Sequence, residues 1–455
     1  MHYFDSMKDR VFHRFILLSF GLALLSSSGV FSQPRPDSPN KPVADTLYHI
    51  NFDDYFTSST LRVDYFMAGY HDNTSVYLSQ IRKEPYWGGN HKNLIDFMNL
   101  GSFRYIIMDS ATGKIIYIRG FSNLFQEWQG TEEAKTLKRA FAQVAVVPFP
   151  LHTILFQIDI RSITTGKFEK LFETYINPRS IFINKEKNHQ LPFVTLQETG
   201  DPENRVDLAL VAEGYTAEEM PKFLKDAERI MDYFFTVKPY SDYKNKFNIY
   251  AIESPSDESG VTIPGRGVYL NTSGGSSFYT FNMDRYMTIQ DSRAIYDIAA
   301  NVPYDVIFVL VNSAKYGGGG FFNHYGESTV DNYLSEIVSI HEFGHTFAGL
   351  ADEYYTSEVT YSDFYKLDVE PWEPNITTNV NFDQKWRRMI PKGTPVPTPR
   401  TEEYKGTIGM FEGGGYMGKG VYSPMMDCRM KSNEAKGFCP VCEEAIKKMI
   451  LFDCE

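Results

Sequence analysis

Positive charge, long apolar runs and cysteine are all scarce in this chain of 455 residues. The formal net charge is -12, which argues against nucleic acid or an anionic membrane as a partner. The apolar run Phe15–Leu25 is too short to cross a bilayer, and no other stretch is long and apolar enough to do so. We therefore expect no transmembrane segment.

The first 32 residues have the pattern of a signal peptide. Lys8, Arg10 and Arg14 precede the apolar run, and small residues follow it up to Ser32. No cysteine lies close behind the apolar run, so a lipoprotein attachment site is not expected. Residues 1–32 predict export to the periplasm, the cell surface or the medium, and the proline-rich residues 33–44 predict an extended linker.

The few cysteines all fall near the C-terminus, at Cys428, Cys439, Cys442 and Cys454. An even number of cysteines in an exported chain favours two disulfides, and the sequence leaves three pairings open. Cys439 and Cys442 also form a C-x-x-C pair. A redox pair and a structural zinc site made by the four cysteines therefore stay as alternatives.

The hydrophobic pattern divides the rest of the chain into two parts. Short strand-like runs such as Arg104–Met108 dominate residues 45–184 and predict an N-terminal β-sandwich-like domain. The polar stretch 185–204 predicts a second linker. Strand-like and helix-like segments alternate in residues 205–455, which is typical of an α/β domain. The expected fold class is α+β overall.

The most informative segment is an H-E-x-x-H run that begins at His341 and ends at His345. Residues four apart lie on one face of a helix, so both imidazoles can reach one metal ion. Zinc suits two histidines and a carboxylate and keeps a position open for water. Glu342 lies between the histidines and is the candidate general base for that water. Asp331 is the expected N-cap of the helix, and Gly349 is its expected end.

The third metal ligand needs a turn in the chain. In the metzincin pattern, a glycine after the helix lets the chain return with a third ligand. Gly349 comes one residue later than in that pattern, and Asp352 follows it by three residues. Asp352 is therefore the preferred third ligand, with Glu353 and the distant His324 as alternatives. The expected metal is a single catalytic Zn²⁺ ion.

The fourteen residues from His341 to Tyr354, HEFGHTFAGLADEY, resemble the IgA peptidase family of zinc metallopeptidases. A looser similarity extends over residues 205–455 and includes Val206–Thr216 and the glycine-rich stretch Tyr316–Gly326. The resemblance implies a metzincin-like, secreted zinc endopeptidase. Its substrate would be a protein or peptide, possibly a glycoprotein, and need not be immunoglobulin A.

Two further features give weaker expectations about the catalytic residues. Tyr422 is the first candidate to stabilise the oxyanion of the reaction, with Tyr416 as the alternative, and Met425 or Met426 could lie below the metal. The glycine run Gly317–Gly320 lacks the Gly-Lys-Ser/Thr ending of a phosphate loop. It predicts instead a flexible or edge-strand segment near the cleft, because peptide substrates often add to an exposed edge, and a mobile loop without a role stays as the alternative.

A second class of function stays open at this point. The chain could be a β-rich extracellular binding or adhesion protein whose peptidase domain is secondary or inactive. The presence of Glu342 favours the enzyme, because an inactive relative is expected to lose this residue or a histidine. The sequence does not indicate an oligomeric state.

Overall fold

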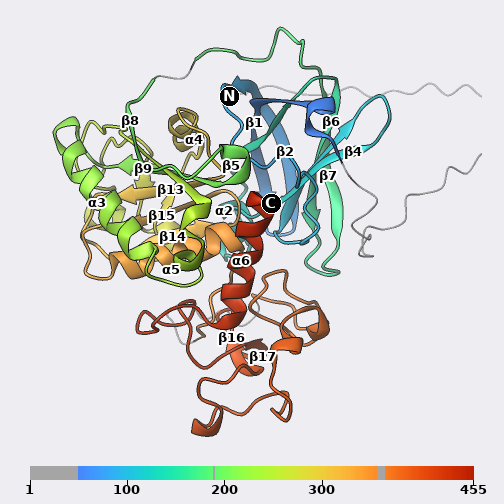
Figure 1. Ribbon diagram of the computed structural model, residues 1–455, viewed down its shortest axis with the longest axis vertical. Coiled ribbons are helices and arrows are strands. Elements are labelled where there is room, and N and C mark those ends of the chain that lie inside the picture. Colours follow the sequence, from blue (N-terminus) through green and yellow to red (C-terminus); the bar gives the residue numbers. More distant parts are fainter. Residues whose placement is uncertain (1–49, 188–189, 356–363) are drawn as a thin grey trace, which may run out of the picture. The chain divides into compact units, whose positions relative to one another are not determined.

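The computed structural model describes residues 50–187, 190–355 and 364–455. The expected signal peptide (1–32) and first linker (33–44) lie outside the described residues. The N-terminal part contains two antiparallel sheets (Figure 1). The first sheet has the order β2-β1-β5, with β1 (Phe56–Tyr70), β2 (Asn73–Glu84) and β5 (Arg139–Pro150). The second has the order β4-β3-β6-β7, with β3 (Phe103–Asp109), β4 (Ile115–Phe121), β6 (Ile154–Arg161) and β7 (Phe168–Ile176).

The two N-terminal sheets share one aromatic core. Tyr65 of β1 lies opposite Tyr105 of β3, and their hydroxyl oxygens are 3.3 Å apart. The ring of Tyr105 also stacks on that of Phe121, with ring centroids 4.2 Å apart. Aromatic side chains therefore fill the space between the two sheets, where each large ring buries a large apolar surface.

The second part is built on a mixed six-stranded sheet with the order β14-β15-β13-β9-β10-β8. The strands are β8 (Phe193–Gln197), β9 (Val206–Glu213), β10 (Phe247–Ile252), β13 (Val306–Val311), β14 (Gly318–Phe321) and β15 (Tyr325–Thr329). The four central strands are parallel, and the outer strands β14 and β8 are antiparallel to their neighbours. Parallel strands of this kind are buried on both faces, and each residue of β9 is buried accordingly.

The two faces of this sheet belong to different cores. Leu208 and Leu210 of β9 point into a core with the helices α3 (Met220–Phe234), α5 (Ser335–Ala348) and α6 (Pro440–Cys454). Ala209 and Val211, which alternate with them, point into the core that also contains the N-terminal sheets and α4 (Arg293–Ala299). The N-terminal part therefore covers one face of the second sheet and shares a continuous core with it.

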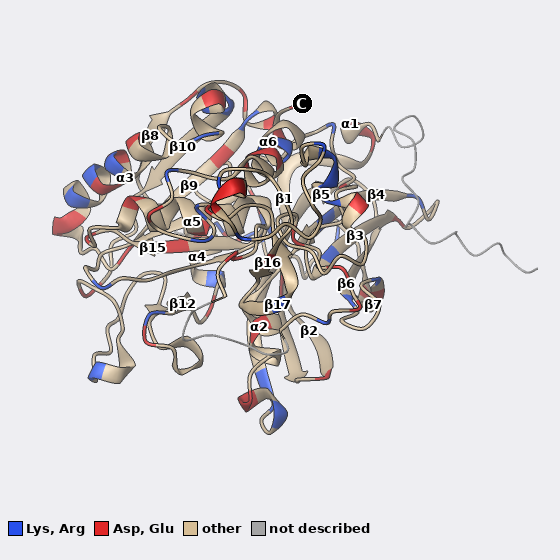
Figure 2. Ribbon diagram, turned by 90° about the horizontal axis from the view of Figure 1, so that it is seen from below, with Lys and Arg blue, Asp and Glu red and all other residues tan. Residues whose placement is uncertain are grey.

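The helix α3 shows why these segments fold as they do. Its sequence places Phe223, Ala227 and Ile230 on one buried face. Acidic and basic residues alternate along the remaining surface of α3 (Figure 2). A capping box of Thr216 and Glu219 lies just before α3, with both side-chain contacts made.

The remaining elements are short. They are α1 (Phe52–Tyr55), α2 (Leu124–Gln129), β11 (Ser276–Ser277), β12 (Thr288–Ile289), β16 (Phe411–Gly414) and β17 (Met417–Ser423). The 3₁₀ turns span Glu133–Lys135, Pro202–Asn204, Ala217–Glu219, Tyr240–Lys246, Pro264–Arg266, Thr280–Asn282, Phe382–Gln384, Arg387–Met389 and Glu402–Tyr404. Among the described residues, no helix is long and apolar enough to cross a membrane.

The segment 185–204, expected to be a linker, has a structural role of its own. It contains β8, which pairs with β10 and forms the outer strand of the six-stranded sheet. Strands at a sheet edge carry fewer apolar residues than central ones, and the side chains of β8 are exposed or half-buried. The polar residues of this segment lie before and after β8, whose own sequence is FVTLQ.

Candidate metal centre

The helix α5 carries the H-E-x-x-H residues between the sheet and the C-terminal segments. It begins at Ser335, four residues after the expected N-cap Asp331, whose carboxylate instead pairs with Lys222 at 2.9 Å. It ends where expected, at Gly349, with a left-handed φ of 60°. A Cβ at this position would lie 2.8 Å from the ring of Trp372. Glycine therefore both permits the turn and leaves room for the packed ring.

The turn at Gly349 brings Asp352 back to the two histidines. The Nε2 atoms of His341 and His345 are 3.1 Å apart. The Oδ1 atom of Asp352 lies 3.0 Å from the first Nε2 and 3.4 Å from the second. The structure therefore gathers the three residues that the sequence singled out as ligands.

Backbone carbonyls hold both imidazole rings. The Nδ1 atom of His341 lies 3.0 Å from the carbonyl oxygen of Arg429, and that of His345 lies 2.6 Å from the carbonyl oxygen of Leu350. A carbonyl only accepts, so Nδ1 must carry the proton in each ring. In the neutral form of each ring, the Nε2 lone pair then faces the centre between the three residues, as in metal-ligating histidines.

Asp352 is almost fully buried. Its Oδ2 atom accepts a hydrogen bond from the hydroxyl of Tyr416. Its Oδ1 atom is buried without a partner in hydrogen-bonding geometry, although both histidines are near. Burial alone would raise the pKa of Asp352, but His345 and His341 hold it well below its usual range. Burial would likewise lower the pKa of His345, and Asp352 outweighs it and raises that pKa to about 9.

The donor set fits a zinc ion. In a tetrahedral site with zinc–nitrogen and zinc–oxygen bonds of about 2.0–2.1 Å, donor atoms are separated by about 3.3 Å. The three observed separations of 3.0, 3.1 and 3.4 Å scatter around that value. A cation would also give the unpartnered Oδ1 atom of Asp352 the contact that it lacks.

Glu342 lies beside this group and against the edge strand. A Cβ on Gly318 would lie 2.8 Å from Cγ and 2.9 Å from Oε1 of Glu342, so the glycine strand β14 packs directly on this side chain. Burial raises the pKa of Glu342, and His341 opposes that shift. The glycine run is thus the outermost strand of the sheet, next to Glu342, although Tyr286 forms a bridge to Gly318 on its outer side.

The N-terminal part contributes a carboxylate that sequence reasoning missed. Glu127 of α2 accepts a hydrogen bond from the hydroxyl of Tyr286. Burial raises the pKa of Glu127 to about 7, and the charges of His345 and Asp352 also act on it. Glu127 is more than 200 positions away from the H-E-x-x-H run in sequence, and no motif marks it. Only the contact between the two parts of the chain reveals its place.

The other candidates from the sequence lie in different surroundings. Tyr422 is part of β17, and its pKa is raised by burial and by Glu412. Among the described contacts, Tyr416 and not Tyr422 meets the three ligands, as a donor to Asp352. His324 is buried with its Nδ1 atom 2.8 Å from the hydroxyl of Tyr296 and does not belong to the ligand group.

A methionine does pack on the helix α5, but at a position that the sequence did not single out. A Cβ on Gly344, between the two histidines, would lie 3.0 Å from Sδ of Met430. Met425, one of the two expected residues, is a partly buried residue at the margin of the core. The close packing between Met430 and Gly344 needs a glycine within the H-E-x-x-H run.

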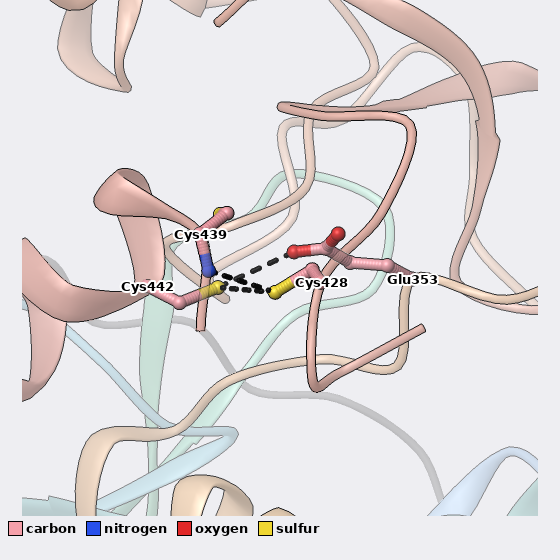
Figure 3. Close-up of side chains that lie close together, drawn as sticks. All are labelled: Glu353, Cys428, Cys439 and Cys442. Carbon is pink, nitrogen blue, oxygen red and sulfur yellow. Dashed lines mark hydrogen bonds between the residues drawn. The ribbon is translucent and has the colours of Figure 1, made fainter. Parts of the chain in front are cut away.

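The expected disulfides are not found. Cys428, Cys439, Cys442 and Cys454 all belong to the described residues, and each is free. Cys454 donates to the carbonyl oxygen of Lys246, apart from the others. The other three converge on the carboxylate of Glu353 (Figure 3). An assembly of three thiols around one carboxylate does not sort into two pairs, which is why the prediction from an even count fails.

Two family models match the chain. The model of the IgA peptidase M64 family matches residues 194–406 and 400–450, and the model of the peptidase M64 N-terminus matches residues 51–173. The first match covers more than half of the chain and includes the whole ligand group. No protein among the curated ones compared matches the chain.

Proposed function

The chain belongs to the IgA peptidase M64 family, and on this premise we propose that it is a secreted, zinc-dependent endopeptidase. Its substrates would be extracellular proteins or glycoproteins, and its catalytic domain would be metzincin-like. The observation that carries the proposal is the approach of His341, His345 and Asp352 around one point, with Glu342 beside them. A metal ion at such a centre lets a peptidase use water as the nucleophile.

His341, His345 and Asp352 would hold the ion through two Nε2 atoms and Oδ1. When bound, zinc supplies Lewis acidity to a water molecule and to the carbonyl of the peptide bond. The Oε1 atom of Glu342 would accept the proton of the attacking water and pass it to the leaving amine. The raised pKa of Glu342 suits a group that must both take up and release a proton.

The strand β14 supports a peptide substrate in this role. Its backbone runs directly against Glu342, so a chain beside it would pass close to the base. Glycines at 318, 319 and 320 leave no side chains between that backbone and its neighbours. Gly318, the first residue of β14, bridges to Tyr286. We propose that the residues of β14 after Gly318 bind the backbone of the substrate as an added strand.

Export is proposed from the pattern of residues 1–32 alone. We expect the mature chain to begin near Gln33, which N-terminal sequencing of the exported protein would establish. A protein that stays inside the cell with residues 1–32 uncleaved would refute the proposed export. It would leave the proposed catalytic mechanism unaffected.

Glu342→Gln tests the proposed chemistry. It keeps the size of the side chain and removes its basicity, so zinc content should stay unchanged while hydrolysis falls by at least about 100-fold. Glu336→Gln on the same helix is the control, since Glu336 pairs with Arg229 and should leave activity intact. Mass spectrometry of extracellular proteins incubated with Glu342→Gln or with the control Glu336→Gln would identify the substrates as the proteins that only the control cleaves. Full hydrolysis by zinc-loaded Glu342→Gln would refute the mechanism and leave a binding role for the β-rich part as the alternative.

A further inference from the structure

Three cysteines and one carboxylate meet at a second point, next to the candidate metal centre. Cys428 precedes the C-terminal helix, Cys439 is the N-cap of α6, and Cys442 lies in its first turn. Glu353 reaches them from the segment after α5. One donor atom from each residue lies within 4.8 Å of the others.

Two of the separations between these donor atoms are close to those of a tetrahedral zinc site, and all of them are within 4.8 Å. Two thiolates bound to zinc at about 2.3 Å are about 3.8 Å apart, and a thiolate and a carboxylate oxygen are about 3.5 Å apart. The Sγ atoms of Cys428 and Cys442 are 3.7 Å apart. The Sγ atom of Cys442 lies 3.3 Å from Oε1 of Glu353. A disulfide would need about 2.05 Å between the sulfur atoms.

The cluster is closed to solvent and incomplete in its hydrogen bonds. Glu353 and Cys442 are 0% exposed, and Cys439 is 3% exposed. Such burial disfavours a redox pair, because a reactive thiol must be reached by its partner. Figure 3 shows the carboxylate of Glu353 directed at the sulfur atoms. Its Oε2 atom is buried without any partner, which is costly unless a cation is present.

Surrounding groups orient the donors in the way that supports metal ligands. The backbone N–H of Cys439 donates to Sγ of Cys428 at 3.2 Å, which favours a thiolate. The side-chain amide of Asn375 donates to Oε1 of Glu353 at 3.1 Å. The ammonium group of Lys431 donates to the carbonyl oxygen of Glu353 at 2.9 Å and adds positive charge next to the anionic cluster.

We infer that Glu353, Cys428, Cys439 and Cys442 form a second, structural zinc site. Thiolates and a carboxylate in tetrahedral separation select zinc over the hard cations magnesium and calcium. With four protein donors the site has no open position for water, so its role is structural.

The proposed site would fix two of the contacts on which the first centre depends. Glu353 directly follows Asp352, and its backbone N–H donates to the carbonyl oxygen of Met430 at 2.8 Å. Arg429, between Cys428 and Met430, supplies the carbonyl that holds the ring of His341. An ion bound by both Cys428 and Glu353 would therefore fix the position of Asp352, which precedes Glu353. It would also fix the carbonyl of Arg429, which accepts from His341.

Zinc content of the full-length mature protein tests the inference. We expect two zinc ions per wild-type chain, about one in Cys442→Ser, and two in Cys454→Ser. Cys454→Ser is a matched control, because Cys454 is a buried cysteine outside the cluster. A zinc content that Cys442→Ser leaves at the wild-type value, or a Cys428–Cys442 disulfide in peptide maps of the unreduced protein, would overturn the inference.

Cobalt separates the two centres and does not depend on catalysis. Only the cysteine cluster contains sulfur, so Co²⁺ added to metal-free protein should give thiolate-to-cobalt absorption from this site alone. We expect the absorption in wild type and in His341→Ala, and none in Cys442→Ser. If Cys442→Ser does not fold, Glu353→Gln is the second variant, because it keeps the three thiols. Titration of its absorption band should show an affinity for Co²⁺ about 10–100-fold weaker than that of wild type. Absence of the band in wild type, or an unchanged affinity in Glu353→Gln, would overturn the inference.

Discussion

Asp352 and Glu353 are neighbours in the chain, yet their carboxylates face opposite sides of it. Asp352 lies 3.0 Å from Nε2 of His341, whereas Glu353 accepts from Cys442 at 3.3 Å. In an extended segment, successive side chains point in opposite directions. The two acidic residues therefore belong to different clusters and should respond differently to substitution.

The assignment of Asp352 as the third ligand predicts a loss of catalytic metal. Asp352→Ala should lower zinc affinity of this centre by more than about 100-fold, because it removes a donor rather than a supporting contact. Activity should fall with it. Zinc retained after dialysis against a mild chelator measures the effect, with the exposed Asp368→Ala as control. Unchanged activity in Asp352→Ala would mean that Asp352 is not the third ligand.

The two tyrosines near the C-terminal hairpin should differ in their effect on the metal. Tyr416 donates to Oδ2 of Asp352, so Tyr416→Phe should weaken zinc binding by about 10–100-fold. Tyr422→Phe should leave zinc affinity unchanged, and a loss of turnover in that variant would support its predicted oxyanion role. Competition with a chromogenic chelator measures both variants. Equal zinc affinities of Tyr416→Phe and wild type would contradict the structural role of Tyr416.

The turn after α5 should be sensitive to any side chain. Gly349→Ala places a residue with a Cβ at a φ of 60°, which costs about 1–2 kcal/mol, and sets that Cβ 2.8 Å from Trp372. Gly267→Ala is a matched control, since Gly267 has a φ of 67° but nothing within 4 Å of its Cβ. Denaturant unfolding should therefore show a larger loss for Gly349→Ala. Equal losses would mean that packing against Trp372 has no effect.

The buried His324 predicts a pH-dependent stability. Burial lowers its pKa to about 3, whereas an unfolded chain has a histidine pKa of about 6.5. The unfolded state therefore binds the extra proton between these values, so stability falls as the pH is lowered from about 6.5 towards 3. Relative to His324→Gln, wild type should lose about 1.4 kcal/mol per pH unit in this window.

Denaturant unfolding between pH 4.5 and pH 7 would measure this difference. A constant difference in the free energy of unfolding would contradict the buried neutral state of His324. Zinc content of His324→Gln should equal that of wild type, because His324 binds Tyr296 and not the ligand group.

Local sequence predicted which three side chains the structure brings together in the candidate metal centre. The spacing of His341 and His345 follows from helix geometry, and Gly349 marks the end of the helix because few other residues adopt a left-handed backbone. Asp352 then follows from the need to return to the same face. Each of these steps uses contacts between residues close in sequence, which a single chain reveals.

Contacts between distant segments were beyond such reasoning. Tyr416 is 64 residues from Asp352, and Arg429 is 88 residues from His341. The even number of cysteines predicted disulfides. That number carries no information about Glu353, whose carboxylate lies among three of the cysteines. Two relationships between the expected domains also join distant segments: β8 lies within residues 185–204 and pairs with β10, and the N-terminal sheets share a core with the second sheet.

The most direct test of the account is removal and return of zinc. Wild-type protein made metal-free with a chelator should lose peptide hydrolysis, and added Zn²⁺ should restore it, whereas Mg²⁺ should not. Metal-free Asp352→Ala should not recover under the same conditions. Full hydrolysis by wild-type protein shown to contain no metal would contradict the claim that His341, His345 and Asp352 hold a catalytic zinc ion.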